Sequence, residues 1–301
     1  MNDNMPRMSQ HIIASEVSWQ HSSLIFSIGC AIHLYVARLI YRTSYTMKVQ
    51  TMSETDVKEF VKHRYSEIAR QEASCCCSCD SSSRDIAHQI GYTDDDLNAI
   101  PEEASMGLGC GNPVAQASLQ EGETVLDLGS GGGIDVFLAA KKVGPGGKVI
   151  GIDMTQIMIE KARSLATTHG YENVEFRLGE IEHLPVDNES IDVIISNCVI
   201  NLAPDKAKVF NEASRVLKSG GRILISDLVT EGELPPEVKK NFDAWACCIG
   251  GALEKNQYLT TIQNAGFTNV HIVKETTYDL GVYSQELQGK ITSIQVEAHK
   301  I

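Results

Sequence analysis

Thr124-Val-Leu-Asp-Leu-Gly-Ser-Gly-Gly-Gly133 runs from an apolar strand into a glycine-rich turn that opens a helix. Glycine allows the backbone to turn tightly and to approach a ligand closely. The first turn of the following helix adds unpaired N–H groups, which bind polar ligands. The segment therefore predicts a cofactor site of the nucleotide type at the end of a buried strand.

Strands and helices alternate along the chain from this turn onward. Apolar runs predict strands at residues 124–128, 148–152, 174–178, 191–196 and 221–227. Helices are expected at residues 134–143, 155–168, 204–217, 235–250 and 257–265, and closing strands at residues 270–274 and 292–298. Alternation of this kind means parallel strands joined by right-handed crossovers. The predicted fold class is α/β, with a seven-stranded, mostly parallel sheet and helices on both faces.

The chain before the turn is expected to hold two further parts. Residues 53–104 predict an N-terminal helical segment with a cysteine-rich loop. Residues 105–301 are assigned to the main domain, in which residues 231–265 form a helical region on the substrate side. We interpret residues 1–52 as an extension outside the core, translated from upstream of a start at Met52; an organelle-targeting peptide is the alternative.

The composition limits which partners and which cellular location are expected. A net charge of −13 and a pI of about 5.1 argue against nucleic acid or an anionic membrane as the main partner. The uncharged segment at residues 17–37 is interrupted by Ser, Gln and His, which is weak for a membrane helix. Nine cysteines, several of them adjacent, favour a reducing compartment over a disulfide framework. The expected location is therefore cytoplasmic.

Two acids indicate which cofactor the turn binds. A dinucleotide fingerprint would place its third glycine at position 134, which is Ile134 here. Asp153 ends the second strand, where it could hold two ribose hydroxyls, and Asp127 at the turn could pair with a cationic amino group. Together these features favour S-adenosylmethionine over NAD.

The same residues resemble the motifs of class I S-adenosylmethionine methyltransferases, whose sheet is Rossmann-like. Asp127-x-Gly-x-Gly-x-Gly133 resembles their first motif, Asp153 their ribose-binding acid, and Gly179-Glu-Ile181 the segment beside the adenine. No metal cofactor is implied. The cofactor-binding residues that this resemblance implies are Asp127, Gly129, Ser130, Gly131, Gly133, Asp153, Met154, Glu180, Ile181 and Asn197.

Three cysteines lie in glycine-rich or polar contexts: Cys110 in Gly107-Leu-Gly-Cys-Gly-Asn-Pro113, Cys198 in Ser196-Asn-Cys198, and Cys248 in Cys247-Cys-Ile-Gly-Gly251. Cys198 follows the fourth strand, so it should face the cofactor, because ligands gather at the carboxyl ends of parallel strands. An isolated buried cysteine is most often a small hydrophobic residue. Zinc is the obvious rival ligand, but the paired CxxC spacing and a partner His are absent.

Trivalent arsenic suits three converging thiolates. It is soft, it takes three sulfurs in a pyramid, and its lone pair points away from them. That lone pair could attack a sulfonium methyl group directly, so no general base is required. Catalysis would then consist of proximity and alignment.

The cysteine segments resemble those of the arsenite S-adenosylmethionine methyltransferases over residues 90–265. By that resemblance, Cys198 and Cys248 bind arsenic as a pair, and Cys110 serves in binding and in the redox step. Cys248 is chosen over Cys247 because it directly precedes Ile249-Gly-Gly251. A further family cysteine lies upstream, and the candidates for this auxiliary thiol are Cys75, Cys76, Cys77 and Cys79.

The predicted function is methyl transfer from S-adenosylmethionine to arsenite or its thiol adducts, held by cysteine thiolates, in arsenic detoxification. Methylation raises arsenic to the pentavalent state, so thioredoxin or glutathione is the expected reductant of the enzyme thiols. Two alternatives stay open at this point. One is a methyltransferase for a small organic acceptor, and the other is a thiol-rich protein that sequesters metalloids.

Overall fold

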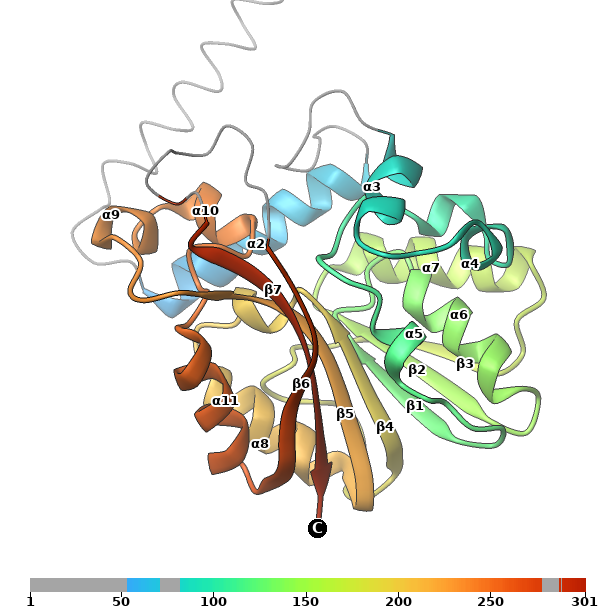
Figure 1. Cartoon of the computed structure of the whole chain (residues 1–301). Helices are drawn as coiled ribbons and strands as arrows, with labels where there is room; N and C mark the ends of the chain where they lie inside the picture. The colour runs from blue at the N-terminus through green and yellow to red at the C-terminus, as the bar shows by residue number, and fades with distance from the viewer. Residues whose placement is uncertain (1–52, 71–81, 278–286, 288) are drawn as a thin grey trace, which may run out of the picture. The chain divides into compact units, whose positions relative to one another are not determined.

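A seven-stranded sheet runs through the middle of the protein, with strand order β3-β2-β1-β4-β5-β7-β6 (Figure 1). The computed structural model describes residues 53–70, 82–277, 287 and 289–301. Strands β1 to β5 are parallel, and β7 is antiparallel to both β5 and β6. The strands are β1 (Thr124–Leu128), β2 (Lys148–Asp153), β3 (Val174–Leu178), β4 (Ile191–Asn197), β5 (Leu217–Thr230), β6 (Phe267–Thr277) and β7 (Ile291–Lys300). The predicted fold class is confirmed.

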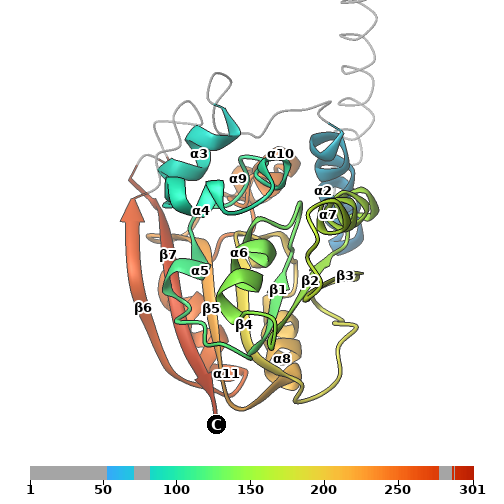
Figure 2. The same ribbon diagram turned by 90° about the vertical axis from the view of Figure 1, so that its right-hand side faces the viewer.

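Two apolar cores cover the two faces of the sheet, because side chains alternate along each strand. Leu126 of β1 belongs to one core, whereas Val125 belongs to the other. The first core includes α8 (Lys206–Val216) and α11 (Lys255–Asn264), and the second includes α6 (Ile134–Val143) and α7 (Gln156–Thr168). Figure 2 shows the strands side by side from β6 to β3, with α6 drawn over them.

The N-terminal helices begin at polar residues that cap them. Ser53, Ser82 and Thr93 each accept a hydrogen bond from the third backbone N–H of a helix, and an Asp returns the bond. This capping box starts α2 (Glu54–Ala69), α3 (Ser83–Gln89) and α4 (Asp94–Asn98). Short elements follow at η1 (Glu102–Ala104) and α5 (Pro113–Gln116).

The single helix predicted at residues 235–250 is wrong. The structure has two short helices, α9 (Pro236–Lys239) and α10 (Phe242–Ala246). Asn241 lies in an extended conformation, and its side chain accepts a hydrogen bond from the Ala244 N–H, so it begins a second helix. A further short helix, η2 (Ile200–Leu202), follows β4.

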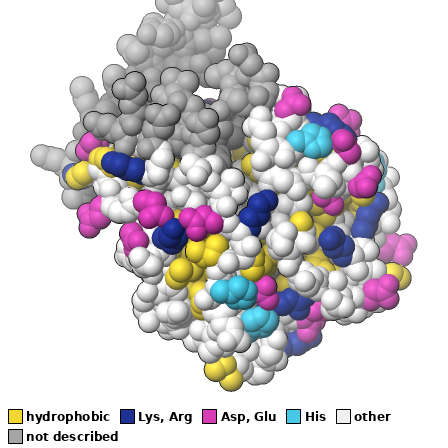
Figure 3. All heavy atoms as spheres, in the orientation of Figure 1, with side chains coloured by type: hydrophobic (Ala, Val, Ile, Leu, Met, Phe, Trp, Pro, Cys, Tyr) yellow, Lys and Arg dark blue, Asp and Glu magenta, His cyan; other side chains and the backbone are white. Residues whose placement is uncertain are grey.

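The described surface carries mixed charge on the face that Figure 3 shows, where acidic side chains lie among basic ones. Within the described residues, no helix is long and apolar enough to cross a membrane. The extension at residues 1–52 and the cysteine-rich loop at residues 75–79 lie outside the described residues.

The glycine-rich turn depends on a left-handed backbone. Gly129, Gly131 and Gly133 have φ angles of 70°, 52° and 97°. A Cβ atom on Gly133 would lie 2.8 Å from a ring carbon of Phe137 and 3.0 Å from one of Phe176. Both the φ angle and the space therefore require glycine where α6 begins.

We expect Gly133→Ala to lower the free energy of unfolding by roughly 1–3 kcal/mol, because it combines backbone strain with overpacking. Gly146→Ala is the matched control, since Gly146 has no positive φ and no heavy atom within 4 Å of a Cβ. Urea unfolding of both variants measures the difference. Equal stability of the two variants would contradict this account of the turn.

Candidate active site

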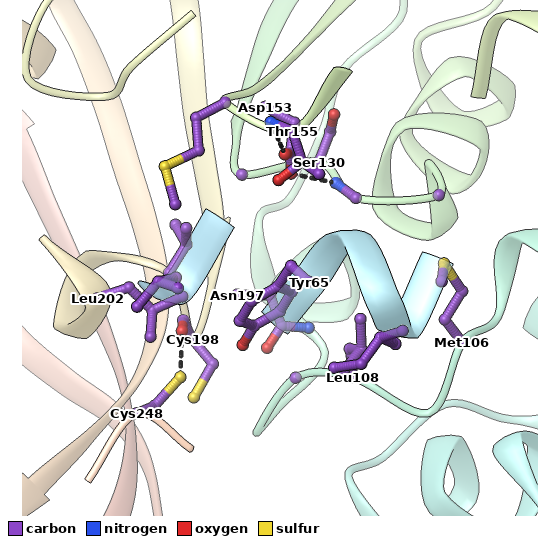
Figure 4. A pocket seen from close by; sticks show the side chains of 18 of the residues that line it. Tyr65, Met106, Leu108, Ser130, Asp153, Thr155, Asn197, Cys198, Leu202 and Cys248 are labelled. Atoms are coloured by element: carbon purple, nitrogen blue, oxygen red, sulfur yellow. Dashed lines mark hydrogen bonds between the residues drawn. The ribbon is translucent and has the colours of Figure 1, made fainter. Parts of the chain in front are cut away.

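A pocket lies at the carboxyl ends of the parallel strands, and predicted cofactor residues line it together with Cys198 and Cys248 (Figure 4). Cys247 also lines the pocket, whereas Cys110 does not. Its walls come from the turn after β1, the ends of β2 and β4, helix α2, the loop at residues 104–109 and the segment after α10. The expected cofactor residues on its lining are Asp127, Gly129, Ser130, Gly131, Asp153, Met154, Ile181 and Asn197. Gly133 and Glu180 are not on the lining.

Asp153 is held at the glycine-rich turn by two backbone amides. Its carboxylate accepts hydrogen bonds from the Gly131 N–H at 3.0 Å and the Thr155 N–H at 2.8 Å. Burial raises the pKa of Asp153, and these bonds act in the opposite direction. The buried Ser130 hydroxyl finds no hydrogen-bond partner among the described residues. Both groups are therefore placed to bind the polar part of a ligand.

Buried acids give this part of the pocket negative character. Burial raises the pKa of Asp127 well above its usual value, and the charges of Asp135 and Asp153 add to the effect. Burial also raises the pKa of Asp135 to about 6, although Tyr92 donates a hydrogen bond to its carboxylate at 2.8 Å. No Lys or Arg of the described residues forms an ion pair with these acids. The pocket therefore suits a cationic ligand.

The structure brings the three predicted thiols together. A carboxylate oxygen of Asp227 and the Sγ atoms of Cys110 and Cys198 all lie within 4.8 Å of one another. The Cys248 thiol donates to the Cys198 carbonyl at 2.7 Å, and the Cys198 thiol contacts those of Cys110 and Cys248. All three are buried free thiols. Figure 4 shows the Cys198 and Cys248 sulfurs on the same side of the pocket.

The thiols are protonated in the absence of a ligand. Burial raises the pKa of Cys110, whereas the contact with Cys110 is the main cause that raises the pKa of Cys198. The contact with Cys198 likewise raises the pKa of Cys248 well above its usual value. The raised pKa values favour the protonated form of these thiols when no ligand is bound.

Cys198 and Cys248 lie in strained backbone, with φ angles of 61° and 63°. The left-handed region costs a residue other than glycine about 1–2 kcal/mol. Hydrogen bonds hold both conformations, from the Cys198 N–H to the Ser226 carbonyl at 2.7 Å and from the Cys248 N–H to the Trp245 carbonyl at 2.9 Å. Strain of this kind is concentrated at functional sites.

The neighbouring cysteine differs from Cys248. Cys247 is in a disulfide, whereas Cys248 is a free thiol. The proposed auxiliary thiols, Cys75, Cys76, Cys77 and Cys79, lie outside the described residues.

A buried lysine and a buried aspartate near the thiols, Lys206 and Asp227, were not anticipated by the sequence-based prediction. The ammonium of Lys206 donates to the carbonyls of Asn201 and Ala203 at 3.3 and 3.0 Å, and it lies 5.5 Å from the ring centre of Trp245. Burial lowers the pKa of Lys206 to about 8 and raises that of Asp227 to about 7, while their mutual attraction opposes both shifts. The pair therefore ties the η2 segment to the thiol cluster.

Helix α2 closes one side of the pocket, which the sequence-based prediction also did not anticipate. Lys58 of α2 bonds to the carboxylates of Glu180 at 2.7 Å and Glu182 at 2.8 Å. Tyr65 donates a hydrogen bond to the Ala246 carbonyl at 3.2 Å. Glu180, expected beside the adenine, therefore forms an ion pair with Lys58 and is not on the lining. The buried Glu182 lines the pocket.

Comparisons with known proteins agree with this site. A family described as a methyltransferase domain matches residues 119–266. The arsenite methyltransferase of Halobacterium salinarum is 43% identical over 261 residues, covering 81% of this chain and 67% of the relative. The arsenite methyltransferase of Homo sapiens is 34% identical, covering 79% of this chain and 64% of the relative. The chain thus spans about two thirds of the length of these curated relatives.

A solved structure gives the same result at the level of the fold. The arsenic(III) S-adenosylmethionine methyltransferase from Chlamydomonas reinhardtii superposes with a TM-score of 0.58 at 33% identity, covering 74% of this chain and 75% of that chain. Sequence identity, coverage and fold lead to one conclusion. The chain belongs to the arsenite methyltransferase family of S-adenosylmethionine-dependent methyltransferases.

Proposed function

We propose that this chain methylates trivalent arsenic held by Cys110, Cys198 and Cys248. The observation that carries the proposal is the cluster of three buried free thiols at the edge of the cofactor pocket. The cluster favours a soft ion over an organic acceptor or a simple apolar core, because soft sulfur ligands select soft ions.

The pocket residues fit S-adenosylmethionine, which supplies an electrophilic methyl group. Asp153 and the Ser130 hydroxyl are placed for the ribose, and the buried acids Asp127 and Asp135 suit the ammonium and sulfonium charges. Because these acids have no cationic partner among the described residues, a cationic ligand relieves their mutual repulsion.

Arsenous acid can bind to protonated thiols without a base. Each thiol sulfur replaces one hydroxide on arsenic, and the thiol proton leaves with that hydroxide as water. The raised pKa values of the thiols are therefore compatible with binding. The arsenic lone pair would then form the new bond to the methyl carbon while the carbon–sulfur bond of the sulfonium breaks, and S-adenosylhomocysteine would leave as a neutral thioether. The acceptor loses no proton, so the chain's contribution is alignment.

The redox cycle and location complete the proposal. Two enzyme thiols supply the electrons that return arsenic to the trivalent state, and they close as a disulfide. Thioredoxin or glutathione would reopen it by thiol–disulfide exchange, and the reducing cytoplasm is the compartment that we propose for this cycle.

The central test incubates the protein with arsenite, a thiol reductant and methyl-labelled S-adenosylmethionine. We expect labelled methylarsenicals, and we expect Cys198→Ser to lower the rate by about 100-fold or more, because the acceptor is displaced from its line of attack. Arsenite bound without any label transfer would instead support sequestration. An undiminished rate in Cys198→Ser would remove this thiol from the site.

Adjacent cysteines provide a matched pair. We expect Cys248→Ser to abolish arsenite methylation, while Cys247→Ser keeps a rate within about threefold of the parent in excess reductant, since the Cys248 thiol contacts Cys198 whereas Cys247 is in a disulfide. Initial rates at saturating S-adenosylmethionine measure both. The reverse pattern would reassign the role to Cys247.

Cofactor affinity should depend on pH through the buried acids. The pKa of Asp135 is raised to about 6, so protonation below that pH removes negative charge from the pocket. We expect calorimetry to show S-adenosylmethionine binding about tenfold weaker at about pH 5 than at about pH 7.5. S-adenosylhomocysteine, which lacks the sulfonium charge, should change less, and Asp135→Asn should flatten the profile. An equal pH dependence for both ligands would contradict this electrostatic role.

A further inference from the structure

The side chain of Asn197 is bound to the backbone of the Cys110 loop. Its Oδ1 accepts hydrogen bonds from the Cys110 N–H at 2.9 Å and the Gly111 N–H at 3.3 Å. Its Nδ2 donates to the Gly111 carbonyl at 2.7 Å. The partners on both ends of the amide settle its orientation, because one end must accept and the other must donate.

The loop fits closely around this amide. Gly109 has a φ angle of 109°, and a Cβ there would lie 2.8 Å from the Asn197 Nδ2. A Cβ on Gly111 would lie 2.6 Å from the Ser226 Oγ. The two glycines therefore allow the backbone on either side of Cys110 to rest directly on the ends of β4 and β5.

A second contact holds the other end of the same residue. The Ser293 hydroxyl of β7 donates to the Cys110 carbonyl at 2.7 Å. Asn197 thus fixes the amide of Cys110, and Ser293 fixes its carbonyl. The direction of the Cys110 thiol is determined by these two contacts, because no regular helix or strand includes residues 105–112.

The same amide is also connected to the cofactor side. Nδ2 donates to the Tyr92 hydroxyl at 3.0 Å and lies 3.3 Å from a carboxylate oxygen of Asp135. Tyr92 in turn donates to the other carboxylate oxygen of Asp135. Asn197 therefore has its hydrogen-bonding capacity occupied by protein groups, which leaves little for a cofactor.

We propose that Asn197 is a positioning residue for arsenic, which holds the Cys110 thiol against Cys198 so that the site offers three sulfurs instead of two. The inference rests on the proposed arsenic site. It goes beyond that site by naming the Asn197 side-chain amide, at the end of β4, as the group that holds the third sulfur, that of Cys110, in position. It replaces the expectation that Asn197 binds the cofactor. Thiols must be held within a fraction of an ångström to share one small ion.

The test counts sulfurs around bound arsenic by X-ray absorption, in the parent and in Asn197→Ala. We expect three As–S bonds in the parent and two in the variant. Arsenite affinity should fall by about 10- to 100-fold with the loss of the amide contacts. Phenylarsenite has one position occupied by carbon and needs only two thiols, so its affinity should be unchanged.

Two further variants test whether the position of the Cys110 loop is the cause. Gly109→Ala retains the amide but pushes the loop from it, so it should also reduce the sulfur count to two. Asn173→Ala is the control, because the Asn173 amide also bonds to the backbone, donating to two carbonyls at 2.9 and 3.0 Å, but lies outside the pocket lining. It should keep three sulfurs.

The outcomes separate the inference from the proposed function. Fewer than three As–S bonds in the parent would overturn the three-thiol site itself. Three As–S bonds in Asn197→Ala, together with weaker S-adenosylmethionine binding, would show that Asn197 binds the cofactor and would overturn the inference. Equal weakening of arsenite and phenylarsenite would show a general structural role and would also overturn the inference.

Discussion

The hydrogen bond from the Cys198 amide to the Ser226 carbonyl is the contact on which the site depends. It extends the β4–β5 pairing one residue past Asn197, where the backbone enters the left-handed region. The Asn197 amide consequently reaches the Cys110 loop, while the Cys198 thiol meets those of Cys110 and Cys248. The end of β4 therefore positions both the loop that carries Cys110 and the Cys198 thiol.

The two halves of the pocket are electrostatically different. The half near the glycine-rich turn contains buried acids without a cationic partner among the described residues, which suits a cationic methyl donor. The other half contains protonated thiols, and the acid beside them, Asp227, is balanced by the Lys206 ammonium. A neutral arsenous acid, which we propose as the substrate, would enter this half without separating charge and would release its hydroxides as water.

Much of the fold was predictable because it follows from local patterns. Apolar runs and the glycine-rich turn predicted the central strands, whereas the region near Asn241 was misjudged, where a capping residue divides a helix into two. The cysteine contexts predicted the three thiols that meet in the structure. The buried pair Lys206–Asp227 could not be predicted, because its members are 21 residues apart and neither belongs to a motif. The same holds for the contact of Lys58 with Glu182.

The sequence by itself determined the order of strands and helices and the glycine-rich turn, and it predicted which cysteines come together, since these depend on periodicity, glycine and residue chemistry. Only the tertiary structure decided that Asn197 bonds to the Cys110 loop, that Glu180 pairs with Lys58, and that the thiols rest in protonated form. Those properties depend on burial and on contacts between distant segments. The packed fold creates both, and no local stretch of sequence contains them.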